Sequence, residues 1–142
     1  MSYQLTLTAS ILRQTDGANI PVDLLNGDYR EYLAWCDAGN TPAAYVPPAP
    51  TNDDFINATQ KRLDALATSW NYDSMLSLVT YIDSLIPRFK AEATAGRDFR
   101  DATWADVVTI QTEVMGGTLA MPATIADYLS LLPAIPSRPV IA

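Results

Sequence analysis

The chain has 142 residues, of which 49% are hydrophobic and 18% charged, and its formal net charge is −7. This length and composition are typical of about one globular domain, with or without a small appendage. Because 16 acidic residues outnumber 9 scattered basic ones, we expect neither nucleic acid nor an anionic membrane surface as a partner. No apolar run approaches the ~18 residues of a membrane-spanning helix.

The first residues alternate between apolar and polar side chains, which predicts a single half-buried strand over residues 3–11. Its apolar, odd-numbered positions are Tyr3, Leu5, Leu7, Ala9 and Ile11. Gly17 suits a turn with positive φ, and the short return strand that follows should end at Pro21, which cannot donate to a ladder. Much of the first strand would therefore lack a partner within the chain.

A helix is expected next, from Asp28 to Ala38, with Asn26 as its N-cap. Its apolar stripe has helical spacing and consists of Tyr29, Tyr32, Leu33 and Cys36. Gly39 or Asn40 can end the helix in a left-handed conformation. Residues 43–50 contain three prolines and are interpreted as a semi-rigid linker.

Three amphipathic helices are predicted in the remainder of the chain. The first is capped by Thr51 or Asn52, extends to about Trp70 and can be broken by Asn71; its apolar stripe consists of Ile56, Thr59, Leu63, Leu66, Ala67 and Trp70. The second is capped by Asp73, and its stripe consists of Met75, Leu78, Val79, Ile82, Leu85 and Ile86. The third has a broad apolar face that consists of Trp104, Val107, Val108, Ile110 and Val114. Pro87 should separate the second from the third, which we expect to be broken near Gly96 and to end at Gly116 and Gly117. A short helix is expected over residues 124–132, and the proline-containing end should be extended.

Together these elements predict an α+β, mainly α, protein. A β-hairpin and helix form a head at residues 1–42, and a linker follows at 43–50. A three-to-four-helix bundle occupies 51–132, and an extended arm occupies 133–142.

The chain offers little catalytic chemistry. It has no histidine, one cysteine and none of the common nucleophile or phosphate-loop motifs, so we expect no enzyme and no catalytic, cofactor-binding or metal-binding residues. Asp98 and Asp101, with Glu92 before them, could bind magnesium or calcium. Because Arg97 and Arg100 alternate with these aspartates, an exposed ion-pair face is the preferred interpretation. Cys36 is interpreted as a small buried hydrophobic residue.

The aromatic residues divide between core and interface. Trp70 and Trp104 lie on apolar stripes and are expected in the core. The head is predicted to be the main docking element, because an unpaired strand edge recruits other chains. Its candidate interface residues are Tyr3, Leu5, Leu7, Trp35 and Tyr45. Alternatively, the helical body, or a strand near Val140 and Ile141, completes the small sheet.

Two groups of residues resemble modules found in small tail proteins of tailed bacteriophages. The first comprises Asp16-Gly17-Ala18, Ile20-Pro21, Asn26-x-Asp28-Tyr29-x-x-Tyr32-Leu33-Ala34-Trp35 and Gly39-Asn40-Thr41-Pro42. The second comprises Arg62-Leu63-Asp64, Tyr72-Asp73-Ser74, Phe89-x-x-Glu92-Ala93, Arg100-Asp101-x-x-Trp104 and Pro122. Together they extend over most of residues 11–122, and they include no catalytic residues.

The resemblance implies a tail, tail-fibre or tail-fibre-assembly protein. One expectation is a non-enzymatic structural protein of the virion, made in the bacterial host cytoplasm, that contacts fibre or baseplate proteins or further copies of itself. A second is an assembly chaperone that helps a fibre to fold or trimerise and is not retained in the virion. A host-directed or enzymatic accessory is the third. The proline linker between a small head and a helical body favours a connector, and thus the first.

Overall fold

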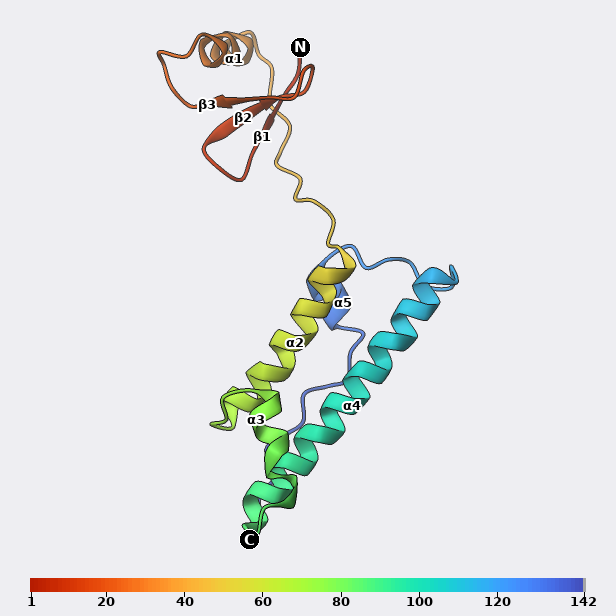
Figure 1. The fold of residues 1–142 in the computed structure, drawn as a ribbon. Helices are drawn as coiled ribbons and strands as arrows, with labels where there is room; N and C mark the ends of the chain where they lie inside the picture. Colours follow the sequence, from red (N-terminus) through yellow and green to blue (C-terminus); the bar gives the residue numbers. More distant parts are fainter. Residues whose placement is uncertain (142) are drawn as a thin grey trace. The chain divides into compact units, whose positions relative to one another are not determined.

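The computed structural model describes residues 1–141 and shows an α+β protein that is mainly helical (Figure 1). The chain forms two compact units, Met1–Pro48 and Ala49–Ala142, each with its own buried core. The N-terminal unit holds a small antiparallel sheet and one helix, and the other unit, called here the helical unit, holds the remaining helices. Within residues 1–141, none of the helices combines the length and apolar character needed to cross a membrane.

The sheet of the N-terminal unit has three strands in the order β1-β2-β3. They are β1 (Tyr3–Leu5), β2 (Ser10–Arg13) and β3 (Ala18–Pro21). Ile11 lies opposite Leu5 on one side and Ile20 on the other. The turn before β3 contains Gly17 at φ +74°, and β3 ends at Pro21, as predicted.

The prediction of one continuous strand over residues 3–11 is wrong. The chain reverses between β1 and β2, where the hydroxyl of Thr6 donates to the carbonyl oxygens of Thr8 and Ser10 at 2.7 and 2.9 Å. Such local side-chain bonds compete with an extended ladder. The remaining edge of β1 is also occupied, because Ala43 exchanges backbone hydrogen bonds of 2.9 Å with Tyr3 and Leu5. Residue 43, from the N-terminal unit itself, therefore pairs with the edge of β1 that was expected to lack a partner within the chain.

Helix α1 (Gly27–Asp37) packs against the sheet. The side chain of Asn26 accepts from the backbone N–H of Tyr29, and Gly39 ends the helix region at φ +93°, both as predicted. The core of this unit consists of Tyr3, Ile11, Ile20 and Tyr32.

In the helical unit, α2 (Asn52–Ser69) begins with a capping box. Thr51 accepts from the backbone N–H of Asp54, and the Asp54 carboxylate accepts from the backbone N–H of Thr51 at 2.7 Å. The predicted stripe is buried at Thr59, Leu63, Leu66 and Ala67, and Phe55 is buried where Ile56 was expected. Asn71 adopts a φ of +71° directly after α2, in keeping with its predicted role as a helix breaker.

The predicted second helix is shorter than expected. It consists of α3 (Met75–Val79) and a 3₁₀ turn, η1 (Thr80–Asp83), and its cap is Ser74 instead of Asp73. Leu85 and Ile86 were assigned to the apolar stripe, but they are 99% and 53% exposed. The segment leaves helical geometry before Pro87, and Ile86 has the extended backbone that a following proline requires.

Helix α4 (Pro87–Met115) is unbroken, so the expected break near Gly96 is wrong. A Cβ placed on Gly96 would lie 2.5 Å from Cδ2 of Leu78. The glycine therefore marks a close approach of α3 to α4 and not a helix end. The predicted stop is confirmed, since Gly116 caps α4 and Gly117 has φ +77°.

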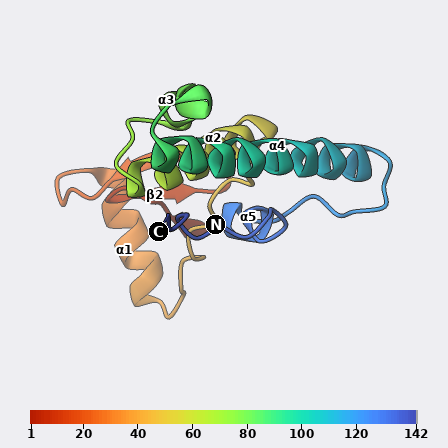
Figure 2. The same ribbon diagram turned by 90° about the horizontal axis from the view of Figure 1, so that it is seen from below.

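The chain then forms α5 (Ile125–Leu129), capped by Thr124, inside the predicted range 124–132. Residues 133–141 have no regular secondary structure, and Ala142, the end of the predicted arm, lies outside the described residues. After α5 the chain runs back along the helices toward the beginning of α4 (Figure 1). Figure 2 shows α4 as the long helix of this unit, seen from below.

The helical unit contains two buried clusters. One joins α2, α3 and the first half of α4 and includes Trp70, and the other joins Phe55, the second half of α4 and α5. Trp70 is thus in the core, as predicted. Trp104 is half-buried and packs against both clusters, which places it at their junction. Val108, which was expected on the buried face of α4, is 61% exposed.

Candidate functional site

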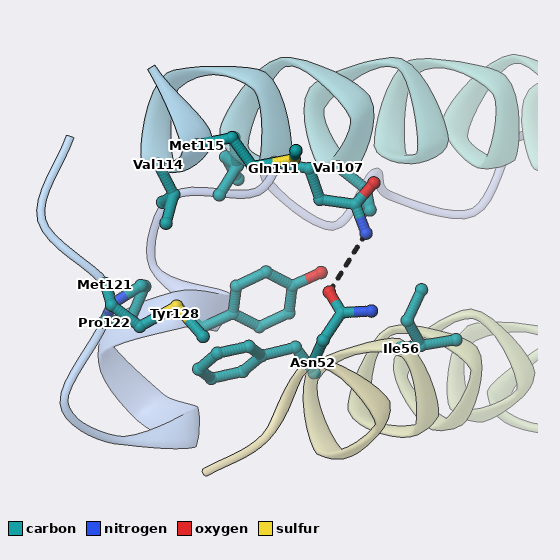
Figure 3. A pocket seen from close by; sticks show the side chains of 11 residues that line it. Asn52, Ile56, Val107, Gln111, Val114, Met115, Met121, Pro122 and Tyr128 are labelled. Carbon is teal, nitrogen blue, oxygen red and sulfur yellow. Dashed lines mark hydrogen bonds between the residues drawn. The ribbon is translucent and has the colours of Figure 1, made fainter. Parts of the chain in front are cut away.

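An apolar groove lies between the first half of α2 and the second half of α4, and Tyr128 of α5 contributes to its lining (Figure 3). In Figure 1 the two long helices converge toward α3 and separate toward α5. The groove has a volume of about 410 Å³, within the range of ligand-binding pockets. Its lining residues are Asn52, Phe55, Ile56, Val107, Ile110, Gln111, Val114, Met115, Met121, Pro122 and Tyr128.

Helical periodicity builds the α4 wall of the groove. Val107, Ile110, Gln111 and Val114 follow one another at i, i+3, i+4 and i+7, so all four face the same side. Met115 extends this wall outward and is 90% exposed. Met121 and Pro122, from the connection between α4 and α5, lie at one end of the groove (Figure 3).

Tyr128 fixes the inner part of the groove. Its ring packs on Phe55 with the centroids 4.5 Å apart, and its hydroxyl lies 2.6 Å from the hydroxyl of the buried Thr59. Residues 69 positions apart in the chain are thereby held together. A buried, hydrogen-bonded tyrosine of this kind gives the groove a rigid base.

The polar groups of the groove are few. The side-chain amide of Gln111 donates to the side-chain oxygen of Asn52 at 3.1 Å, which links the two helical walls (Figure 3). Apart from these amides and the Tyr128 hydroxyl, the lining side chains are hydrocarbon or thioether. The arrangement can bind apolar groups, but its lining contains no carboxylate, amine or thiol to act on them.

A second group of residues, the Glu92 cluster, lies near the beginning of α4. Glu92 is fully buried and accepts from the Tyr72 hydroxyl at 2.6 Å, from Arg88 at 3.1 Å and from Arg138 at 2.7 Å. Arg138 also donates to the carbonyl oxygen of Trp70 at 2.9 Å. The cluster therefore attaches the segment after α5 to α4 and to the end of α2.

Burial alone would raise the pKa of Glu92, but the hydrogen bonds from Arg138, Tyr72 and Arg88 outweigh it and lower the pKa to about 2. Burial, followed by the bond to Glu92, raises the pKa of Tyr72 to about 12. Both groups are thus held in one protonation state at neutral pH. A fully paired carboxylate of this kind is suited to holding the fold together and not to proton transfer.

The five interface candidates of the N-terminal unit divide between core and surface. Tyr3 is 1% exposed and packs edge-on against Trp35, with ring centroids 5.0 Å apart. Its assignment to a partner interface is therefore wrong, because its ring fills the core of this unit. Trp35 is half-buried against the same core. Leu5, Leu7 and Tyr45 are exposed, and Leu7 lies on the turn between β1 and β2.

An exposed apolar loop lies between β3 and α1 and was not predicted from the sequence. Val22, Leu24 and Leu25 are all more than half exposed there. Asp23 organises the loop by accepting from the backbone N–H of Leu25 at 2.9 Å. The loop lacks a periodic pattern, so a run of apolar residues was the only available signal.

The remaining chemical candidates have structural roles. Asp98 pairs with Arg97 at 2.7 Å and Asp101 with Arg100 at 2.9 Å, which agrees with the ion-pair interpretation. Glu92 is directed to its own cluster. Cys36 is a free, half-buried thiol packed against the core of the N-terminal unit. Within the described part of the chain, no three potential ligands are grouped as a metal site.

The sequence predicted the two walls of the groove but not the groove. The stripes of α2 and α4 were recognised, whereas the separation of these helices depends on packing across the whole unit. Met115, Met121 and the link between Asn52 and Gln111 carried no pattern of their own. Comparison of the chain with protein-family models, with curated protein sequences and with solved structures gave no match.

Proposed function

We propose that this chain is a non-enzymatic structural protein of a bacteriophage tail that connects fibre or baseplate components through protein–protein contacts. The observation that carries the proposal is the division into two units, each with its own core, at a boundary that falls within the proline-rich segment 43–50. A chain built in this way can bind one partner through each unit. The tail assignment itself rests on the resemblance of residues 11–122 to small tail proteins.

Each unit carries an apolar surface suited to a protein contact. On the helical unit it is the groove, whose lining is almost entirely apolar. On the N-terminal unit it is the exposed Val22, Leu24 and Leu25 loop and the exposed Leu7. Contiguous exposed apolar side chains are typical of binding surfaces.

The test is to purify the phage particles and measure this protein in them by quantitative mass spectrometry. A connector should be present in a fixed ratio to the fibre or baseplate proteins and should stay bound through gradient purification. Particles from a deletion strain should then lack the attached component. If the particles contain none of the protein, yet the deletion still abolishes fibres, the alternative of an assembly chaperone holds and the connector proposal fails.

A further inference from the structure

We propose that the groove binds an amphipathic helical segment of a partner protein, with apolar residues on one side and lysine or arginine residues flanking them. The proposal rests on the proposed function in treating the chain as a protein-binding component. It adds the chemistry of the partner that the helical unit recognises.

The shape of the groove favours a helix. Its walls are two helices that separate toward α5, and an amphipathic helix commonly binds by laying its apolar side into such a groove. The volume of about 410 Å³ accommodates a few large apolar side chains. Met115 and Met121 border it, and flexible thioether side chains adapt to the shape of an apolar ligand.

The charge around the groove indicates which residues should flank the apolar side of that helix. Residues 49–60 and 102–137, which form the groove and its surroundings, contain five acidic residues and no basic residue. They are Asp53, Asp54, Asp106, Glu113 and Asp127. The nearest basic residues in the chain, Lys61, Arg100 and Arg138, lie outside these segments. An excess of one charge around an apolar surface favours partners of the opposite charge.

Helix geometry places acidic residues beside the lining residues. Asp106 and Glu113 stand about two turns apart on α4, and Ile110, which lines the groove, lies four residues after one and three before the other. On the opposite wall Asp53 is three residues before Ile56, which also lines the groove. Carboxylates therefore flank the apolar surface on both walls.

Other occupants fit this surface less well. A fatty acid or another anionic ligand would meet carboxylates and no cation in the segments that form the groove. A second copy of this chain would bring its own net charge of −7, and most of its arginines are already paired with carboxylates. The basic, amphipathic partner is the one that matches both the apolar lining and the acidic surroundings.

The experiment titrates the full chain with a model peptide of about 18 residues, built from leucine and lysine with the leucines at helical spacing. A matched peptide carries glutamate at every lysine position. Binding is measured by isothermal titration calorimetry, and gel filtration with light scattering gives the oligomeric state. We expect saturable binding of the lysine peptide at least about 10-fold tighter than that of the glutamate peptide, decreasing at higher salt.

Two pairs of variants locate the binding. Met115→Gln with Met121→Gln removes apolar surface without changing the charge, and it should weaken binding of the lysine peptide at least about 10-fold. Leu76→Gln, at an exposed apolar position on α3, should change that binding less than about 2-fold. Asp106→Lys with Glu113→Lys should also weaken binding of the lysine peptide at least about 10-fold. The control, Asp73→Lys with Asp83→Lys, makes the same change in net charge away from the groove and should change this binding less than about 3-fold. Circular dichroism melts show whether each variant is folded. If the methionine variant does not fold, the comparison between the two charge variants tests the proposal.

Equal binding of the two peptides, or equal losses in the groove and control variants, would overturn the proposal. So would the absence of saturable binding. A stable dimer that the Met115 and Met121 variant dissociates would assign the groove to a second copy instead. None of these results bears on whether the protein is present in purified particles, so the failure of this inference is distinguishable from that of the proposed function.

Discussion

The two ends of the helical unit use the same long helix differently. At the beginning of α4, Glu92 is fully buried, and three side chains from α4, the segment before α3 and the segment after α5 bond to it. At the other end, α2 and α4 are joined across the groove by the bond between Asn52 and Gln111. The first end is closed by a charged network, and the second end leaves apolar side chains open to solvent.

This difference predicts that substitutions at the first end change the stability of the fold, whereas substitutions at the second end change the binding of a partner. A buried carboxylate that loses a partner destabilises the fold, so residues of the Glu92 cluster should respond to substitution through unfolding. Exposed apolar residues such as Met115 make few native contacts, so their substitution should affect a partner and not the fold. Substitutions at the two ends of α4 test this prediction.

Substitution of Glu92 by glutamine should lower the free energy of unfolding by about 3 kcal/mol at neutral pH, because Arg138 and Arg88 lose the charge that they neutralise. Urea unfolding followed by circular dichroism measures it. Asp98→Asn, which removes an exposed pair with Arg97, is the control and should cost less than about 1 kcal/mol. Similar losses in the two variants would contradict the special role of the closed end.

The same carboxylate should make the stability pH-dependent. Its pKa in the folded protein is about 2, below the ordinary value of 4.5, so its contribution is fully present above pH 4.5 and is lost as the pH falls toward 2. A difference of this size corresponds to about 3 kcal/mol. Urea unfolding of the wild type from pH 7 to pH 2 should show the decline, and the Glu92→Gln variant should lack that component. Parallel curves for the two proteins would refute this assignment.

Gly96→Ala tests the packing between α3 and α4. The new Cβ would lie 2.5 Å from Cδ2 of the buried Leu78, so we expect a net destabilisation of about 1–2 kcal/mol despite the better helix propensity of alanine. Ala105→Gly, at an exposed position of the same helix, measures that propensity alone. A stabilised Gly96→Ala protein would mean that Leu78 moves aside freely.

Thr51→Ala removes the cap of α2, beside the groove, and should lower the free energy of unfolding by about 1 kcal/mol. Asn52 and Phe55, which line the groove, lie in the first turn of α2, so the variant should also weaken binding of the lysine peptide. Thr112→Ala is the control, since that hydroxyl donates to the carbonyl oxygen of Val108 within α4. A calorimetric titration and a urea melt of each variant test both expectations.

The smallest expected effect on stability belongs to the groove. Met115→Gln combined with Met121→Gln should change the free energy of unfolding by less than about 0.5 kcal/mol, because Met115 is 90% exposed and Met121 51% exposed. A decrease of several kcal/mol in the free energy of unfolding would mean that the groove residues belong to the packed core. The two ends of the helical unit would then not differ in the way described.

The sequence was sufficient where local physics decides the structure. Helical spacing predicted α2 and α4, side-chain oxygens predicted the caps at Asn26 and Thr51, and glycine predicted the positive φ at Gly17 and Gly39. The helical, mainly α character of the chain followed from these signals.

It was insufficient where distant residues decide the structure. Gly96 looked like a break because the close approach of Leu78 cannot be seen locally. Glu92 looked like part of an exposed charged face, since its partner Arg138 is 46 residues away. The alternation over residues 3–11 continued through a turn that the Thr6 hydroxyl stabilises. The groove likewise exists only because α2 and α4 separate.

The most direct test of the contrast between the two ends is a two-dimensional NMR titration of the full chain with the leucine–lysine peptide. Amide shifts should change in the first half of α2, the second half of α4 and α5, and should stay constant around Glu92, α3 and η1. Changes centred on the Glu92 cluster or on the N-terminal unit would contradict the assignment of the open end of α4 as the binding surface.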